Sequence, residues 1–299
     1  MSVHATLGFL PDEKLFREER PYCLKFEAPK GLRRTNIQAE HRRQIIEDIR
    51  GREKDFNLDK NGFALVPFHT KMAYEDFENE DKIVTVYMTE VAAVIQQLVG
   101  AFRVQIFEYI RKQHQTFPIA TGEAYEHNQP TTMVHIDISK DWARRLAEGL
   151  NHKIDMHDLP SQNYRFYNLW RPIRGPVKDW PLALCDNSNL NVHEIEIGDV
   201  VFEDFTINNE YIRFSPEQKW HYVSDQQASE AWVFVQGDAK PHTRHGISTS
   251  MTVVVFGLHA RKGVPHSSFQ LRGNNNDHVP RETIEIRALA YFEDDSQPL

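Results

Sequence analysis

The chain has little cysteine and no long apolar run. It contains two cysteines, Cys23 and Cys185, in 299 residues. Two thiols cannot build a disulfide framework, so we expect a reducing compartment and a cytoplasmic protein. No uninterrupted apolar run reaches the roughly 18 residues of a membrane-spanning helix, and the first residues lack a basic start followed by an apolar stretch. We therefore expect neither a membrane span nor a signal peptide.

The chain also lacks an excess of positive charge. Its formal net charge is −8, which disfavours a nucleic-acid partner. What it does have is 40% apolar and 26% charged residues, the balance of a globular protein. We expect a single domain over residues 1–299, with a lead-in (1–60), a core with its support layer (61–292) and a short tail (293–299).

The second half of the chain predicts a mainly β fold. From Tyr164 onward, short strands alternate with turn signals and almost no helix occurs, as in a β-barrel or a double-sheet jelly roll. We also expect a hairpin between residues 211–214 and 220–223. Before this region, a strand at 62–67, a helix at 88–99 and a strand at 102–107 predict an α/β support layer. Residues 37–52 predict a short amphipathic helix or a solvated segment, and Ser139 is expected to cap another helix.

The stretch Val134–Ser139 alternates apolar residues with His135 and Asp137. Residues two apart on a strand point to the same side, so this imidazole and carboxylate would project together. They form two ligands of a first-row metal site that needs a third from elsewhere. The alternative is a surface strand with a His–Asp hydrogen bond, because so short a motif often arises by chance in a chain with 15 histidines.

Two later histidines, His242 and His266, are candidates for the third ligand, with His245 and His259 nearby. Downstream, Arg281 and Thr283 would share one face of the last strand. A guanidinium fork beside a hydroxyl suits the capture of a carboxylate. We favour His266, because its spacing would place it on a strand adjacent to this pair; His242 stays open as the alternative.

Several motifs together resemble a known family, the non-haem iron, 2-oxoglutarate-dependent oxygenases of the group that contains fungal gibberellin desaturase and the cephalosporin 7α-methoxylase component. The resemblance covers the chain from about Asn61 onward. The segments that carry it are Asn61-Gly62-Phe63, the His135/Asp137 pair, Asn168-Leu169-Trp170-Arg171-Pro172, Trp220-His221-Tyr222-Val223-Ser224-Asp225, Gly263-Val264-Pro265-His266-Ser267-Ser268-Phe269, and Pro280-Arg281-Glu282-Thr283-Ile284-Glu285.

The resemblance implies a double-stranded β-helix (a cupin-like jelly roll) and a set of site residues. His135, Asp137 and His266 would bind Fe(II), and Arg281 with Thr283 would anchor the distal carboxylate of 2-oxoglutarate. Asn168 and Arg171 would line the same cavity. The chain is longer than the family pattern between residues 237 and 263, which leaves His242 as a competing ligand. Arg287 shares the strand face of Arg281; it would either meet an acidic group of the substrate or pair with Glu285 or another acid, so we do not assign it to the site.

Two imidazoles and one carboxylate leave three positions on octahedral iron, the facial arrangement of non-haem oxygenases. By resemblance, 2-oxoglutarate and O₂ take these positions, and succinate and CO₂ leave as the substrate is oxidised. Asp137 argues against a halogenase, in which we expect that ligand to be vacated for halide. The sequence does not choose between hydroxylation, desaturation and oxidative cyclisation of a small molecule, and it does not give the oligomeric state. The competing functions are an inactive cupin-like metal- or ligand-binding protein and a metal-dependent enzyme that does not use 2-oxoglutarate.

Overall fold

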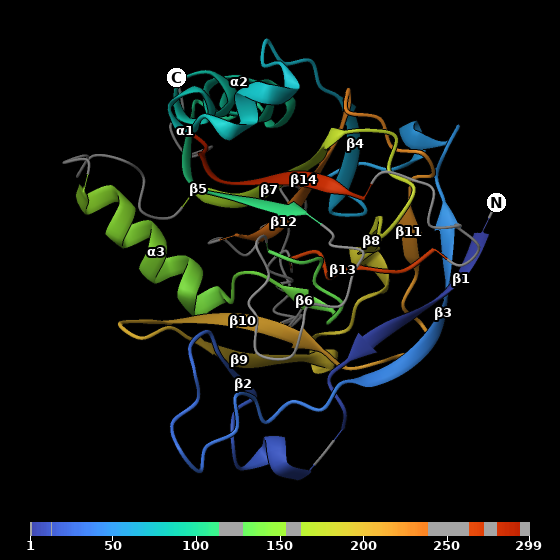
Figure 1. Ribbon diagram of the computed structural model, residues 1–299, viewed down its shortest axis with the longest axis vertical. Coiled ribbons are helices and arrows are strands. Elements are labelled where there is room, and N and C mark those ends of the chain that lie inside the picture. The colour runs from blue at the N-terminus through green and yellow to red at the C-terminus, as the bar shows by residue number, and fades with distance from the viewer. Residues whose placement is uncertain are drawn as a thin grey trace, which may run out of the picture.

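The computed structural model describes residues 2–12, 14–113, 128–153, 163–238, 263–271 and 280–293. Within them, two β-sheets face each other, and helices cover one of the sheets and one end (Figure 1). Residues 253–258, whose β-branched and aromatic content predicts a strand, lie outside the described residues, as do His242, His245 and His259. The mainly β jelly-roll expectation is confirmed by this arrangement.

The smaller sheet has five strands in the order β4-β12-β7-β14-β5. Their bounds are β4 (Phe63–Pro67), β5 (Arg103–Gln113), β7 (Tyr164–Arg174), β12 (Glu230–Asp238) and β14 (Glu282–Tyr291). Side chains alternate between its two faces. On the outer face, Leu169, Val233 and Ile286 pack against a helical layer. The inner face carries the polar groups described below.

A continuous helical run, α1 (Glu80–Lys82), a π-helical turn (Ile83–Tyr87) and α2 (Met88–Val99), covers this outer face (Figure 1). It ends before Gly100, which has a φ of 67°. Together with the edge strands β4 and β5, the run forms the predicted support layer. By length and composition alone it is the one helix in the described part of the chain that could cross a membrane. Ile83, Tyr87 and Val91 pack on the sheet.

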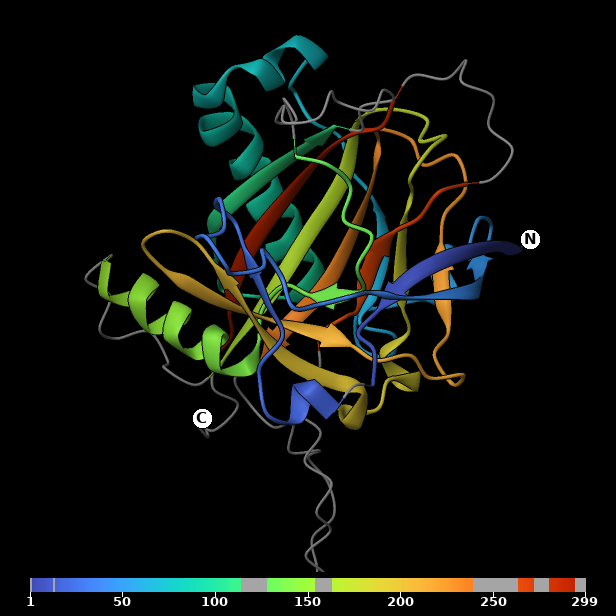
Figure 2. The same ribbon diagram turned by 60° about the horizontal axis from the view of Figure 1, so that its bottom comes forward.

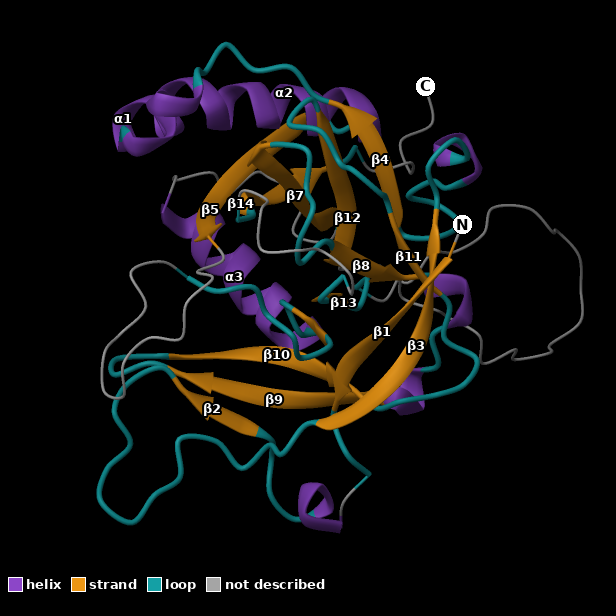
Figure 3. Ribbon diagram, turned by 45° about the vertical axis from the view of Figure 1, so that its right-hand side comes forward, coloured by secondary structure: helices purple, strands orange, loops and turns teal. Residues whose placement is uncertain are grey.

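The larger sheet has nine strands in the order β1-β3-β11-β8-β13-β6-β10-β9-β2. Their bounds are β1 (Ser2–Phe9), β2 (Tyr22–Leu24), β3 (Glu40–Asp48), β6 (His135–Ile136), β8 (Leu182–Cys185), β9 (Ile195–Val201), β10 (Thr206–Ile212), β11 (Trp220–Tyr222) and β13 (His266–Ser268). The edge strand β1 curls back toward β6: Gly8 N donates to Thr132 O at 3.2 Å, and the Gly8 carbonyl accepts from Val134 N at 2.8 Å. Figure 3 shows this curl at β1 and β3.

Three expectations need correction. The segment 37–52 is not a helix: it contains β3, in which Gln44, Ile46 and Asp48 are buried in alternation with exposed neighbours. The lead-in 1–60 is therefore part of the larger sheet, since it supplies β1, β2 and β3. The predicted hairpin is also absent, because β10 pairs with β6 and β9, whereas β11 pairs with β3 and β8.

The helix α3 (Lys140–Lys153) follows directly on β6 and lies at one end of the sheets (Figure 2). Ser139 caps it as predicted, because its Oγ accepts a hydrogen bond from Trp142 N at 3.2 Å. Ala143 and Ala147 pack against Phe166 and Leu289 of the smaller sheet. The helix thus fixes the chain just after the His135/Asp137 pair.

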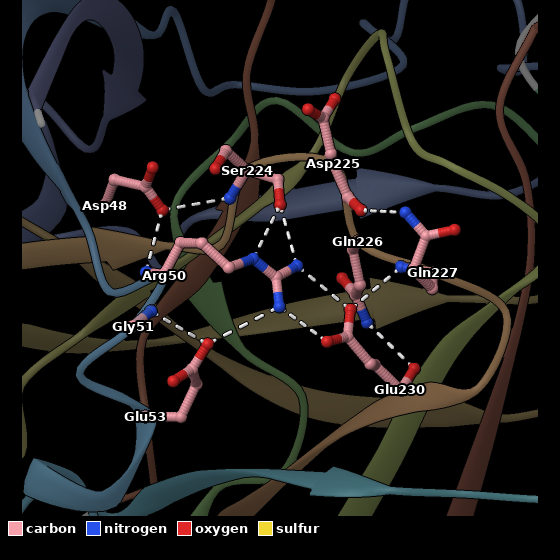
Figure 4. Close-up of polar contacts among 9 residues, drawn as sticks. All are labelled: Asp48, Arg50, Gly51, Glu53, Ser224, Asp225, Gln226, Gln227 and Glu230. Atoms are coloured by element: carbon pink, nitrogen blue, oxygen red, sulfur yellow. Dashed lines mark hydrogen bonds and ion pairs between the residues drawn. The ribbon is translucent and has the colours of Figure 1, made fainter.

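Arg50 connects the two sheets at the opposite end (Figure 4). It follows β3, and its guanidinium donates to the carbonyl of Ser224 at 2.7 Å and to the carboxylate of Glu230 at 2.5 and 3.0 Å. Asp48 accepts hydrogen bonds from the backbone N–H groups of both Arg50 and Ser224 at 3.0 Å. Since Glu230 begins β12, this cluster ties the larger sheet to the smaller one.

Candidate metal centre

His135 and Asp137 project from the short strand β6 into the space between the sheets, and both are buried. The backbone N–H of Asp137 donates to Gln236 Oε1 on β12 at 2.8 Å, so the facing sheet holds the chain at this point. His135 Nε2 lies 3.3 Å from Asp137 Oδ1. The structure therefore brings this predicted pair together as the alternation of the strand requires.

His266 supplies the third group. It lies opposite His135 in the β13–β6 pairing, and the centroids of the two rings are 4.4 Å apart. Its Nε2 is 3.5 Å from Asp137 Oδ2. One ligand atom from each residue falls within 4.8 Å of the others. Contrary to expectation, β13 is not adjacent to β14: the two strands belong to different sheets.

Both histidines turn Nε2 toward this cluster. His135 Nδ1 is 2.7 Å from Met133 O, and His266 Nδ1 is 3.1 Å from Val264 O. A carbonyl only accepts, so each Nδ1 carries a hydrogen, and in the neutral form of such a ring the lone pair is on Nε2. Burial, with a smaller effect of His135, lowers the pKa of His266 to about 3, so this ring is neutral at neutral pH. Two neutral imidazoles and a carboxylate are the ligands that Fe(II) takes, and the residues fit the metal.

Each carboxylate oxygen of Asp137 has a partner, one through a hydrogen bond and the other through an ion pair. Asn168 Nδ2 on β7 donates to Oδ2 at 2.7 Å, and Arg287 Nη2 on β14 lies 2.8 Å from Oδ1. Burial alone would raise the pKa of Asp137, but Arg287 and the two imidazoles outweigh it and hold that pKa well below its usual value. Asp137 is therefore ionised and available as a metal ligand.

Arg281 is buried and lies directly before β14. Its Nη1 donates to Ser268 Oγ at 2.8 Å and to the carbonyl of Trp180, and its guanidinium carbon lies 5.4 Å from the centroid of Trp170. Its Nε has no hydrogen-bond partner among the described residues. Burial lowers the pKa of Arg281 to about 10, so it remains a cation at neutral pH. The guanidinium of Arg281 is thus held in place and charged, and its Nε–H has no acceptor among the described residues.

Thr283 lies two residues along the same face and donates to the carbonyl of Lys112 at 3.3 Å. Lys112 pairs with Thr283 across β5 and β14, and its buried ammonium donates to Thr131 Oγ1 at 3.2 Å. Burial lowers the pKa of Lys112, and burial together with Asp137 raises the pKa of Glu285. The sequence analysis did not identify Lys112 or Glu285, although Glu285 continues the alternation of Arg281 and Thr283.

Asn168 reaches the cluster, but Arg171 does not. The two are three positions apart on β7, an odd spacing that puts them on opposite faces of the sheet. Arg171 lies in the helical layer, with its guanidinium carbon 5.2, 5.6 and 5.5 Å from the ring centroids of Phe68, Phe77 and Tyr87. The expectation that both residues line one cavity is therefore corrected for Arg171.

Comparisons with known proteins match most of the chain. A family model described as "Oxidoreductase/YMDC permease-like domain" matches residues 8–291. The hydroxylase/desaturase efuI of Hormonema carpetanum is 27% identical over 270 residues, covering 84% of this chain and 83% of that protein. The Fe(II)/2-oxoglutarate-dependent dioxygenase nvfI of Aspergillus novofumigatus is 26% identical over 255 residues, covering 82% and 81%.

A solved structure of the iron and alpha-ketoglutarate-dependent endoperoxidase NvfI has the same fold. Its TM-score is 0.80 at 22% identity, and the match covers 98% of this chain and 99% of that one. The family model spans nearly the whole described fold, including the strands that carry His135, Asp137, His266 and Arg281. The protein therefore belongs to the oxidoreductase/YMDC permease-like domain family.

Proposed function

We propose that this protein is a non-haem Fe(II)/2-oxoglutarate-dependent oxygenase that oxidises a small molecule. The observation that carries the proposal is the buried cluster of His135, Asp137 and His266, in which both Nε2 atoms face the carboxylate. Relatives named Fe(II)/2-oxoglutarate-dependent dioxygenase and hydroxylase/desaturase support it, as does the buried Arg281, which donates to Ser268 two residues after His266.

The three ligand residues would hold Fe(II). When bound, the metal and 2-oxoglutarate supply the oxidation: O₂ and 2-oxoglutarate are consumed, succinate and CO₂ are released, and a C–H bond of the substrate is oxidised. The chain contributes orientation and exclusion of water. Trp170, Trp232 and Phe234 are buried on the inner face of the smaller sheet, and Phe234 packs 5.0 Å from the His266 ring. These rings keep the ligand side chains in an apolar surrounding.

Arg281 and Thr283 are proposed to bind the distal carboxylate of 2-oxoglutarate. The guanidinium is held against Trp170 by Ser268 and the carbonyl of Trp180, so it presents a fixed fork. Its Nε, which has no hydrogen-bond partner among the described residues, is the donor that a carboxylate would find, and the Thr283 hydroxyl would turn from the carbonyl of Lys112 to supply a second. Asn168 is assigned to the support of Asp137 and not to the cosubstrate.

The proposal places the substrate in specialised metabolism. The curated relatives include the protein named Aspirochlorine biosynthesis protein N of Aspergillus oryzae, 33% identical over 152 residues that cover 50% of this chain and 56% of that protein. Hydroxylation and desaturation both occur in the relatives' names, so the reaction outcome is left at the level of C–H oxidation. The kinship with gibberellin desaturase and the cephalosporin 7α-methoxylase component, and the cytoplasmic location, stay predictions.

The test is formation of succinate from 2-oxoglutarate by purified protein with Fe(II), ascorbate and candidate substrates. We expect Fe(II)-dependent succinate that falls at least about a hundredfold in Asp137→Ala. Arg144→Ala, on the exposed side of α3, is the control and should retain it. An inactive binding protein would bind metal without consuming 2-oxoglutarate, and a metal enzyme of another type would convert substrate in its absence. Either result would refute the proposal.

A further inference from the structure

We propose that Arg287 is a positioning residue that fixes the orientation of Asp137 for the metal. The inference rests on the proposed function, since it concerns how the same site is held. The sequence analysis left Arg287 outside the site, and its position follows from contacts between the two sheets. It acts through Asp137 and is not itself a ligand.

Each nitrogen of the Arg287 guanidinium lies close to a different carboxyl group. Nη2 lies 2.8 Å from Asp137 Oδ1, Nη1 lies 2.7 Å from Glu108 Oε2, and Nε lies 3.4 Å from Glu285 Oε1. Its side chain is 12% exposed and that of Asp137 is 4% exposed, so the contact to Asp137 is shielded from water. Nη1 donates a hydrogen bond to Glu108, whereas the contacts with Glu285 and Asp137 are ion pairs. The guanidinium is thus tied on one side by Glu108 while Nη2 lies against Asp137.

Asn168 holds the other oxygen of the same carboxylate at 2.7 Å. Arg287 and Asn168 are direct partners in the pairing of β14 with β7, so the two donors stand side by side on one face. On the next strand, β12, Gln236 accepts from the backbone N–H of Asp137. Three adjacent strands of the smaller sheet therefore fix a residue that belongs to the larger sheet. Both carboxylate oxygens of Asp137 are thus held by protein groups, Oδ2 by Asn168 and Oδ1 by Arg287.

Arg287 could act on Asp137 by orienting it or only through its charge, and the two roles predict opposite changes in metal affinity when Arg287 is replaced. A cation beside a metal ligand repels an incoming divalent ion, so a purely electrostatic role predicts tighter metal binding once the charge is removed. A role in orientation predicts weaker binding, since a free carboxylate must be ordered on binding. Residues that support metal ligands in this way typically change affinity about 10- to 100-fold. Lysine keeps the charge but has no planar fork, so it cannot span three carboxylates.

The experiment measures anaerobic binding of Co(II) to the full chain by calorimetry, together with the visible absorption of the bound Co(II), which reports ligand geometry. Arg287→Met and Arg287→Lys are each expected to weaken binding about 10- to 100-fold and to alter the spectrum. Arg171→Lys is the matched control: it changes a buried arginine on the opposite face of the same sheet and should leave both readouts unchanged. Unchanged or tighter binding by Arg287→Met would overturn the inference.

Thermal unfolding of the metal-free variants shows whether they fold, and Asn168→Leu gives a second test that does not touch Arg287. Weaker Co(II) binding by folded Asn168→Leu supports the positioning of Asp137 by Asn168 and Arg287, and wild-type affinity in that variant counts against it. Failure of the wild-type protein to bind Co(II) would reject the proposed function itself. Normal wild-type binding with no effect of the Arg287 variants would reject only the role of Arg287.

Discussion

The buried imidazole of His266 makes the stability of the metal-free protein depend on pH. Burial, and then the neighbouring His135, lower its pKa to about 3 from an ordinary value of 6.5, although Asp137 acts in the other direction. Below pH 6.5 the imidazole is protonated in the unfolded chain but stays neutral in the folded chain. The contribution of His266 to the free energy of unfolding is therefore present above that pH and is lost as the pH falls toward 3.

We therefore expect metal-free wild type to lose about 2 kcal/mol more than His266→Gln between about pH 7 and about pH 5, at about 1.4 kcal/mol for each pH unit below the unfolded pKa. Urea unfolding at the two pH values measures the difference. Equal losses in the two proteins would show that the pKa of His266 is not depressed by folding.

At Arg281, the shape of the side chain should matter as much as its charge. Lysine keeps the charge but cannot contact Ser268, Trp180 and a carboxylate with one planar group. We predict that Arg281→Lys raises the KM for 2-oxoglutarate about tenfold or more, measured by succinate formation. Arg174→Lys, which changes a half-exposed arginine at the end of β7, is the control and should keep the wild-type KM. An unchanged KM in Arg281→Lys would remove this residue from the cosubstrate site.

Among the elements, β13 depends on the close approach of the chain that leads into it. A Cβ on Gly263 would lie 2.3 Å from Ile136 Cγ2 and 2.5 Å from Gln236 O. We predict that Gly263→Ala displaces β13 from β6, lowers the melting temperature and weakens metal binding. Gly237→Ala is the matched control, because a Cβ there meets nothing within 4 Å. Calorimetry with Co(II) and thermal unfolding compare the two; equal metal affinity would contradict the prediction.

The sequence predicted elements whose signal is local. The helices near 88–99 and after Ser139 were recognised from apolar spacing and caps, and His135 and Asp137 from alternation. The strand β3 was missed because its exposed positions are charged and hide the alternation of Gln44, Ile46 and Asp48. Arg287 was considered but not assigned to the site, and Lys112 was not predicted, because the strand period gives the face of a residue, whereas the groups that it meets depend on how the two sheets pack.

At the scale of the whole molecule, the centre lies between two sheets and needs both in place. We propose that the chain folds as one domain, since the first 48 residues contribute three strands to the sheet that carries the histidines. The Arg50 cluster also joins the two sheets (Figure 4). Its ion pair to Glu230 is only partly buried, with side chains 35% and 22% exposed, so its contribution is modest.

Arg50→Ala is expected to destabilise the protein by about 1 kcal/mol, mainly through the lost hydrogen bonds to Ser224 and Glu230, without changing metal affinity. Arg144→Ala removes an ion pair whose partners are 65% and 64% exposed and should have almost no effect. Urea unfolding of both variants measures the difference. Equal stability in the two would mean that the cluster does not hold the sheets together.

The metal content of the ligand variants tests the proposed centre of His135, Asp137 and His266 most directly. Wild-type protein should bind one Co(II) per chain, and we expect His266→Ala to lose tight binding while His242→Ala keeps it. The same titration under anaerobic conditions with Fe(II) should give the same order. Tight binding by His266→Ala together with loss in His242→Ala would contradict the centre described here.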